Sequence, residues 1–251
     1  MKPSVFLDWF GVIADNQLMT RRWRQVEARL LQQRYGGSLS KWVLVHDRAF
    51  RWDLNYWSRH GQKRRASYRS LWRHCEIGWM RRTLTWAGLE PPRSESALFN
   101  LDRELTYEVT RRIDASYPHA RRTLATLRRA GFRLFLVSGA DDTYVEGALE
   151  ATGLKGFFEE TYSPSELNAF KGTRAYWEKV LRMSKSRPEF STVVDDRTKF
   201  LRTPARLGLK AILVSRKPIV KSQFTVLRSI EKLPAVLSPS LKKHPRVRIR
   251  G

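Results

Sequence analysis

Cysteine is almost absent from this chain, in which Cys75 is the only one among 251 residues. A single thiol cannot form an internal disulfide framework or a cysteine-based zinc site, and it is compatible with a reducing cytoplasm, where we expect the protein to act. The sequence also lacks any run of about 18 uncharged apolar residues. We therefore expect no membrane span, and the start of the chain predicts no signal peptide.

Acidic residues are scarce as well. The chain has 24 Asp and Glu against 48 Lys and Arg, which gives a formal net charge of +24. Such a surface attracts phosphorylated substrates and polyanions, so nucleic acid is one candidate partner, although a basic composition can also exist without any such role. With 41% hydrophobic residues the chain can bury a large core, so we expect a globular protein whose oligomeric state is open.

Short apolar runs, each bounded by polar or turn residues, recur along the chain and predict buried strands. These runs are residues 4–8, 133–139, 191–196 and 210–215. Apolar residues at helical spacing lie between the later runs and end before Gly131, Gly153 and Gly208. Strands that alternate with helices predict a doubly wound α/β fold with a parallel sheet.

About a hundred residues with helical patterns throughout interrupt this alternation after the first strand. We predict a core formed by residues 1–14 and 116–235, a helical insertion at 15–115, and a basic tail without fixed structure at 236–251. Residues 21–93 carry 17 Lys and Arg against 5 Asp and Glu, together with seven of the nine tryptophans. These rings could stack on nucleic acid bases, but aromatic residues at helical spacing are more often core.

Polar residues stand where three of the predicted strands end. The first strand ends at Asp8, the second at Ser138 and Gly139, and the third at Asp195 and Asp196. In an open parallel sheet, ligands bind beyond the carboxyl ends of the strands, so we expect these residues to lie close together. A cation, Lys171, lies between the second and third of these strands.

The segments FLDWFGVIAD, LVSGADD, FKG and VVDDR resemble, in this order, the four sequence motifs of the haloacid dehalogenase (HAD) superfamily. The resemblance covers roughly residues 1–14 and 117–216. It implies a Rossmann-like core, and it implies that the helical insertion is the cap of the family.

The resemblance also implies a Mg²⁺-dependent phosphatase that acts on a phosphorylated small molecule. Asp8 would be the nucleophile, and Mg²⁺ would be held by Asp8, Asp196 and the backbone carbonyl of Phe10, with Asp195 as a further ligand or a support. Ser138 and Gly139 would bind a phosphoryl oxygen, and Lys171 would hold the developing charge.

Phe10 departs from the pattern, because phosphatases of the family usually have a second Asp at this position as general acid and base. General acid–base catalysis is typically worth about 10²–10⁴-fold, so we expect a slow enzyme, a good leaving group, or an acid supplied by the insertion. A 2-haloacid dehalogenase would need no such acid, but Asp195 and Asp196 argue against this metal-independent chemistry. A phosphonatase would need an insertion lysine, Lys41 or Lys63, and a small residue in place of Phe10.

A different class of function is a catalytically weakened scaffold that binds nucleic acid or another polyanion through its basic insertion and tail. Other residues have simpler explanations. Asp15 and the pair Asp141 and Asp142 are expected to cap helices, and Cys75 is expected to pack in the core beside His74.

Overall fold

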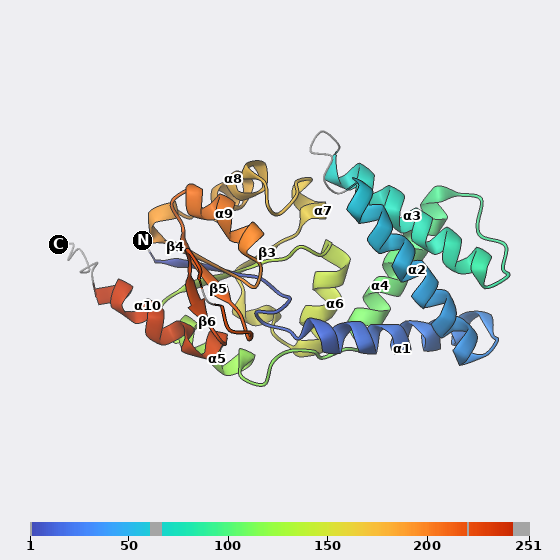
Figure 1. Ribbon diagram of the computed structural model, residues 1–251, viewed down its shortest axis with the longest axis horizontal. Coiled ribbons are helices and arrows are strands. Elements are labelled where there is room, and N and C mark those ends of the chain that lie inside the picture. Colours follow the sequence, from blue (N-terminus) through green and yellow to red (C-terminus); the bar gives the residue numbers. More distant parts are fainter. Residues whose placement is uncertain (1, 61–66, 220, 243–251) are drawn as a thin grey trace.

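The computed structural model, which describes residues 2–60, 67–219 and 221–242, is built around a six-stranded sheet (Figure 1). All paired strands are parallel, in the order β3-β2-β1-β4-β5-β6. The strands are β1 (Ser4–Leu7), β2 (Arg133–Val137), β3 (Glu160–Tyr162), β4 (Ser191–Asp195), β5 (Lys210–Val214) and β6 (Thr225–Leu227). The predicted doubly wound α/β fold is confirmed, and β3 and β6 extend the four predicted strands by one strand at each edge.

Helices cover both faces of this sheet, because successive side chains of a strand point to opposite sides. Val5 and Leu7 of β1 pack in one core cluster with residues of α5 and α10, whereas Phe6 packs in a second cluster with Trp177 of α8. The helices of the core are α5 (Ala120–Arg129), α6 (Asp142–Thr152), α7 (Pro164–Leu167), α8 (Arg174–Met183), α9 (Thr198–Arg206) and α10 (Leu233–Lys242). The central strands are therefore buried on both sides.

Four long helices follow β1 and lie beside the sheet rather than on its faces (Figure 1). They are α1 (Asn16–Tyr35), α2 (Leu39–His60), α3 (Tyr68–Trp86) and α4 (Glu95–Thr110). Within the helical insertion α1 and α3 each pack against α2 and α4, and α4 also packs against α6 of the core. Among the tryptophans of the insertion, Trp42 and Trp72 are buried. Arginine guanidinium groups lie 4.2 Å from the ring centres of Trp52 and Trp86. Lys63 lies outside the described residues.

The two ends of the helical insertion meet at one point. Ala14 forms a bridge with Ser116, Asp15 N–H donates to Ala115 O at 2.8 Å, and Tyr117 N–H donates to Ile13 O at 2.9 Å. The chain therefore leaves and re-enters the core through two adjacent backbone segments.

The predicted tail differs in part from the structure. Residues 236–242 belong to α10, because Leu233 and Leu237 are buried against the core and anchor this helix. The rest of the basic tail lies outside the described residues. Within the described residues, no helix combines the length and the apolar character that crossing a bilayer requires.

Candidate functional site

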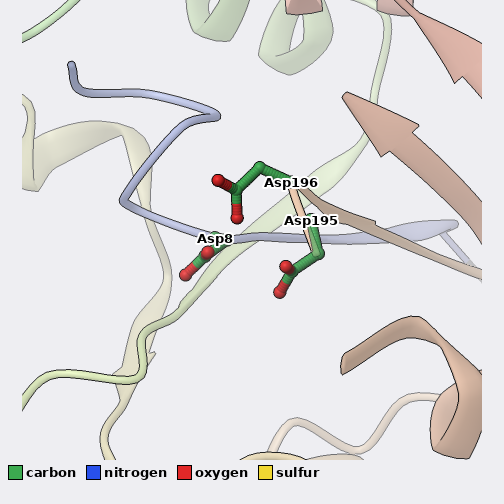
Figure 2. Close-up of side chains that lie close together, drawn as sticks. All are labelled: Asp8, Asp195 and Asp196. Atoms are coloured by element: carbon green, nitrogen blue, oxygen red, sulfur yellow. The ribbon is translucent and has the colours of Figure 1, made fainter. Parts of the chain in front are cut away.

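Three carboxylates gather where two neighbouring strands end. Because β1 and β4 are adjacent and parallel, Asp8 follows β1 at the same edge at which β4 ends in Asp195 and is followed by Asp196. One oxygen atom of each carboxylate lies within 4.8 Å of the others, and Figure 2 shows the three side chains together. The structure thus brings together the acids that the strand ends predicted.

Lys171 connects two of these acids. Its Nζ lies 2.7 Å from Oδ1 of Asp8 and 2.7 Å from Oδ2 of Asp195, and all three side chains are buried. Burial lowers the pKa of Lys171, but the two carboxylates outweigh it and raise that pKa above its usual value. Burial raises the pKa of Asp8 to about 7 despite the opposing charge of Lys171. One ammonium therefore serves two buried carboxylates.

Asp195 and Asp196 differ in their partners. Oδ1 of Asp195 accepts the N–H of Arg197 at 2.8 Å, and its Oδ2 faces Lys171. Oδ1 of Asp196 is buried and accepts no hydrogen bond from the described residues, and the guanidinium of Arg197 is 3.8 Å away. Burial, together with the charge of Asp195, raises the pKa of Asp196. Asp196 thus has a buried carboxylate oxygen that accepts no hydrogen bond from the described residues, and oxygen atoms of this kind are the ligands that Mg²⁺ prefers.

Ser138 and Gly139 lie just beyond β2, as predicted. Ser138 is fully buried, and its hydroxyl accepts the N–H of Ala140 at 3.0 Å, whereas Gly139 lines the cleft described below. Asp141 accepts the N–H of Tyr144 at 3.0 Å and caps α6, and Asp15 caps α1 through Gln17 and Leu18. The predicted capping by Asp15 and Asp141 is confirmed.

Phe10 lies between the carboxylates and the helical insertion. Its ring centre is 5.2 Å from that of Tyr144, which stacks in turn on Trp23 at 5.5 Å. All three rings line the cleft. The position that could have carried a proton-transferring side chain is therefore part of an aromatic wall.

A cleft of about 1090 Å³ opens between the core and the helical insertion. Its lysine and arginine residues, Lys171, Arg197 and Lys199, all come from the core, and its histidine, His46, comes from the insertion. Within the described part of the insertion, no Lys or Arg lines the cleft, and the charged residues that do are Asp53, Glu76 and Asp102. The excess positive charge of the insertion therefore does not reach the space where a substrate would bind.

Two features of the site lie outside the sequence motifs. Arg216, after β5, donates to the backbone oxygen of Gly11 at 2.6 Å and lies 3.7 Å over the ring of Tyr117, so it fastens the loop that follows Asp8. The carboxyl groups of the insertion were also missed, although Glu76 is an acid inside a largely apolar and basic helix. Cys75 is buried as predicted, and its thiol donates to Asp53 at 3.2 Å.

Comparison with known proteins identifies a family that matches most of the chain. A family model described as haloacid dehalogenase-like hydrolase matches residues 3–203. No curated protein shows a significant sequence match to the chain.

Solved structures resemble the chain over nearly its full length. The HAD-hydrolase YfnB from Bacillus subtilis, bound to magnesium, has a TM-score of 0.67 at 16% identity, with 94% of this chain and 98% of that one covered. A 2-haloacid dehalogenase from Pseudomonas syringae pv. Tomato DC3000 has a TM-score of 0.65 at 16% identity, with 96% and 100% covered. A HAD phosphatase from Thermococcus onnurineus has a TM-score of 0.59 at 18% identity, with 94% and 98% covered. At such low sequence identity the structural similarity shows a shared fold alone. The reaction therefore has to be argued from the site.

Proposed function

Because the chain belongs to the haloacid dehalogenase-like hydrolases, we propose that it is a Mg²⁺-dependent phosphomonoesterase with Asp8 as its nucleophile. The observation that carries the proposal is the group of three carboxylates around the ammonium of Lys171. An acidic cluster of this kind needs a further cation before it can accept a phosphate dianion. A phosphatase site that takes Mg²⁺ together with its substrate meets this need.

The residues present fit such a metal. Asp8, Asp196 and the backbone carbonyl of Phe10 would hold it, and the fit is supported by the buried Oδ1 of Asp196, which accepts no hydrogen bond from the described residues and lies 3.8 Å from Nε of Arg197. Asp195 would act as a support, because both of its oxygens already face donors. When bound, Mg²⁺ neutralises charge on the phosphoryl oxygens.

The reaction would proceed in two displacements at phosphorus. A carboxylate oxygen of Asp8 forms a bond to phosphorus while the bond from phosphorus to the substrate alcohol oxygen breaks. Water then attacks the phosphorus of the aspartyl-phosphate, which releases inorganic phosphate and restores the carboxylate. Lys171 stabilises negative charge, and the hydroxyl of Ser138 and the N–H of Gly139 donate to a phosphoryl oxygen.

Phe10 determines which substrates this site can cleave quickly. Its side chain cannot give a proton to the departing oxygen, and it occupies the aromatic wall with Tyr144. We therefore propose substrates whose leaving group departs with little help, or slow turnover of ordinary alkyl esters.

Hydrolysis of a 2-haloacid is the second candidate, and Phe10 is the observation that favours it. In that reaction Asp8 would attack carbon, and the halide would leave as an anion without a proton. The group of three acids at the site argues for the phosphatase, since a negatively charged haloacid would meet three carboxylates and a single lysine ammonium. Polyanion binding by a weakened scaffold remains a third candidate, supported by the net charge of +24.

One experiment separates these functions. Wild type and Asp8→Asn are assayed on p-nitrophenyl phosphate, acyl phosphates and alkyl phosphates, with Mg²⁺ and with EDTA, after purification that removes contaminating phosphatases. Turnover that requires both Asp8 and the metal is the expected result. If both proteins are equally inert, the phosphatase is ruled out, and chloride release from 2-haloacids and salt-sensitive RNA binding decide between the other two.

A further inference from the structure

Four acidic residues line the cleft and form no ion pair with a lysine or arginine among the described residues. They are Asp53, Glu76 and Asp102 of the helical insertion and Asp141 of the core. None of the four forms an ion pair with any Lys or Arg in the part of the chain that the structure describes, although Lys and Arg outnumber Asp and Glu by 48 to 24. The charge of Arg103, whose own ion pair is with Asp142, lowers the pKa of Asp141, so these acids are compensated only in part.

The hydrogen-bond partners of these acids carry no positive charge. Glu76 and Asp102 hydrogen-bond to each other, and Asp102 is only 4% exposed. Asp53 accepts from the thiol of Cys75, and Asp141 accepts one backbone N–H. Burial and the neighbouring acids raise the pKa of both Glu76 and Asp102, which is the effect that an approaching cation would reverse.

A buried hydroxyl group and several aromatic rings supply independent evidence for a ligand. Tyr144 lines the cleft and is 8% exposed, and its hydroxyl group has no hydrogen-bond partner among the described residues. The aromatic rings of Trp57, Tyr68, Trp72 and Trp79 also line the cleft. Aromatic faces beside carboxyl groups attract ammonium ions, and quaternary ammonium ions above all.

The spacing of the acids favours an organic cation over a metal ion. Among the described residues, Asp8, Asp195 and Asp196 bring three ligand atoms within 4.8 Å, and the acids of the insertion do not. A cation spread over several atoms can contact carboxyl groups that stand too far apart to share one metal ion.

The lysine and arginine side chains that line the cleft, Lys171, Arg197 and Lys199, all come from the core, whereas Glu76 and Asp102 come from the insertion. We propose that the substrate is the phosphomonoester of an amino alcohol, with its phosphate toward Lys171 and its ammonium group among Glu76, Asp102 and the aromatic rings. This substrate class rests on the proposed phosphatase function. The charges that line the cleft would thus set the direction in which the substrate enters.

Pairs of esters that differ only in the distal charge test the proposal. Phosphocholine is compared with 3,3-dimethylbutyl phosphate, in which carbon replaces the charged nitrogen, and phosphoethanolamine is compared with ethyl phosphate. We expect kcat/KM to be at least about tenfold higher for the charged member of one pair, since a desolvated ammonium–aromatic contact changes an equilibrium constant by about that factor. Equal kcat/KM values within both pairs would overturn the proposal while leaving the phosphatase intact.

Two variants locate the effect. Glu76→Gln and Asp102→Asn keep the shape of the side chain but remove its ionisable group, and each should reduce the charged-to-neutral ratio severalfold. Glu95→Gln, an exposed change on the same helix as Asp102, is the matched control and should leave the ratio unchanged. Melting temperatures of all three variants check that they fold. A preference that survives in both cleft variants would contradict the assignment of the cation site.

A binding measurement keeps this inference separate from the proposed function. Choline and 3,3-dimethylbutanol are titrated calorimetrically into the full chain and into Asp8→Asn, neither of which needs to turn over. Binding of choline alone, weakened by Glu76→Gln, supports the cation site even if no phosphate ester is hydrolysed. The cation site is refuted if the protein does not bind choline and also hydrolyses neither charged ester better than its neutral partner.

Discussion

The α-carbon of Gly11 faces the carboxylate of Asp196 so closely that a Cβ on Gly11 would lie 2.3 Å from Oδ2 of Asp196. Gly11 also has a φ of 69°, in the region that favours glycine. The loop after Asp8 can therefore pass Asp196 only because Gly11 has no side chain.

Gly11→Ala should displace Asp196 and weaken metal-dependent turnover. Gly88→Ala is the matched control, because Gly88 has a φ of 76° and a Cβ added there would meet no atom within 4 Å, so it carries the backbone strain without the clash. We expect Gly88→Ala to lose about 1 kcal/mol of stability and Gly11→Ala to lose more because of the added clash. Only Gly11→Ala should need more Mg²⁺ for half-maximal activity. Equal Mg²⁺ dependence in both variants would contradict the role given to Asp196.

Lys171→Met should be strongly destabilising, because it leaves the carboxyl groups of Asp8 and Asp195 buried without a cation. Removing one partner of a buried ion pair typically costs about 3–5 kcal/mol. The free energy of unfolding in denaturant, measured at neutral pH without metal, checks this against Lys155→Met, an exposed lysine outside the site. Similar values for the two variants would show that Lys171 does not neutralise these acids.

Phe10→Asp should accelerate hydrolysis of esters with poor leaving groups. A carboxylic acid at this position could protonate the departing oxygen. We expect kcat on ethyl phosphate to rise about 10–100-fold. This gain is smaller than the full effect of general acid catalysis, because the substitution also removes the Phe10 ring from its contact with Tyr144. Little gain is expected on p-nitrophenyl phosphate, whose leaving group needs no proton. A uniform change in kcat on both esters would exclude proton transfer as its cause.

Asp102→Asn should change how stability depends on pH. Burial raises the pKa of Asp102 from 3.8 to about 7, against the opposing hydrogen bond from Glu76. The folded state therefore holds this proton more tightly than the unfolded state, and the wild type loses stability as pH rises from about 4 to about 7. The variant has no such proton to lose, so relative to the wild type it should gain roughly 2–4 kcal/mol across that range. Parallel pH profiles of the unfolding free energy would refute the raised pKa.

The sheet and its acids were predictable because they depend on local patterns. Short apolar runs mark the four inner strands, and parallel pairing brings Asp8 and Asp195 to one edge. The edge strands β3 and β6 have three residues each, too few to show a pattern. Glu76 and Asp102 meet only because α3 packs on α4, a contact between residues 26 positions apart that no local motif encodes. The sequence therefore predicted the acids at the strand ends, but it did not predict that Glu76 and Asp102 meet in the cleft.

The bridge between Ala14 and Ser116 places both ends of the helical insertion at a single point on the core. An insertion whose ends already touch can be exchanged for one of another length without stretching the sheet. The helices of the insertion, with Glu76, Asp102 and their tryptophan rings, can therefore be exchanged as one module while Asp8, Lys171 and Asp196 stay where the strands hold them. The acids at the strand ends and the acids of the insertion are thus carried by separate pieces of chain.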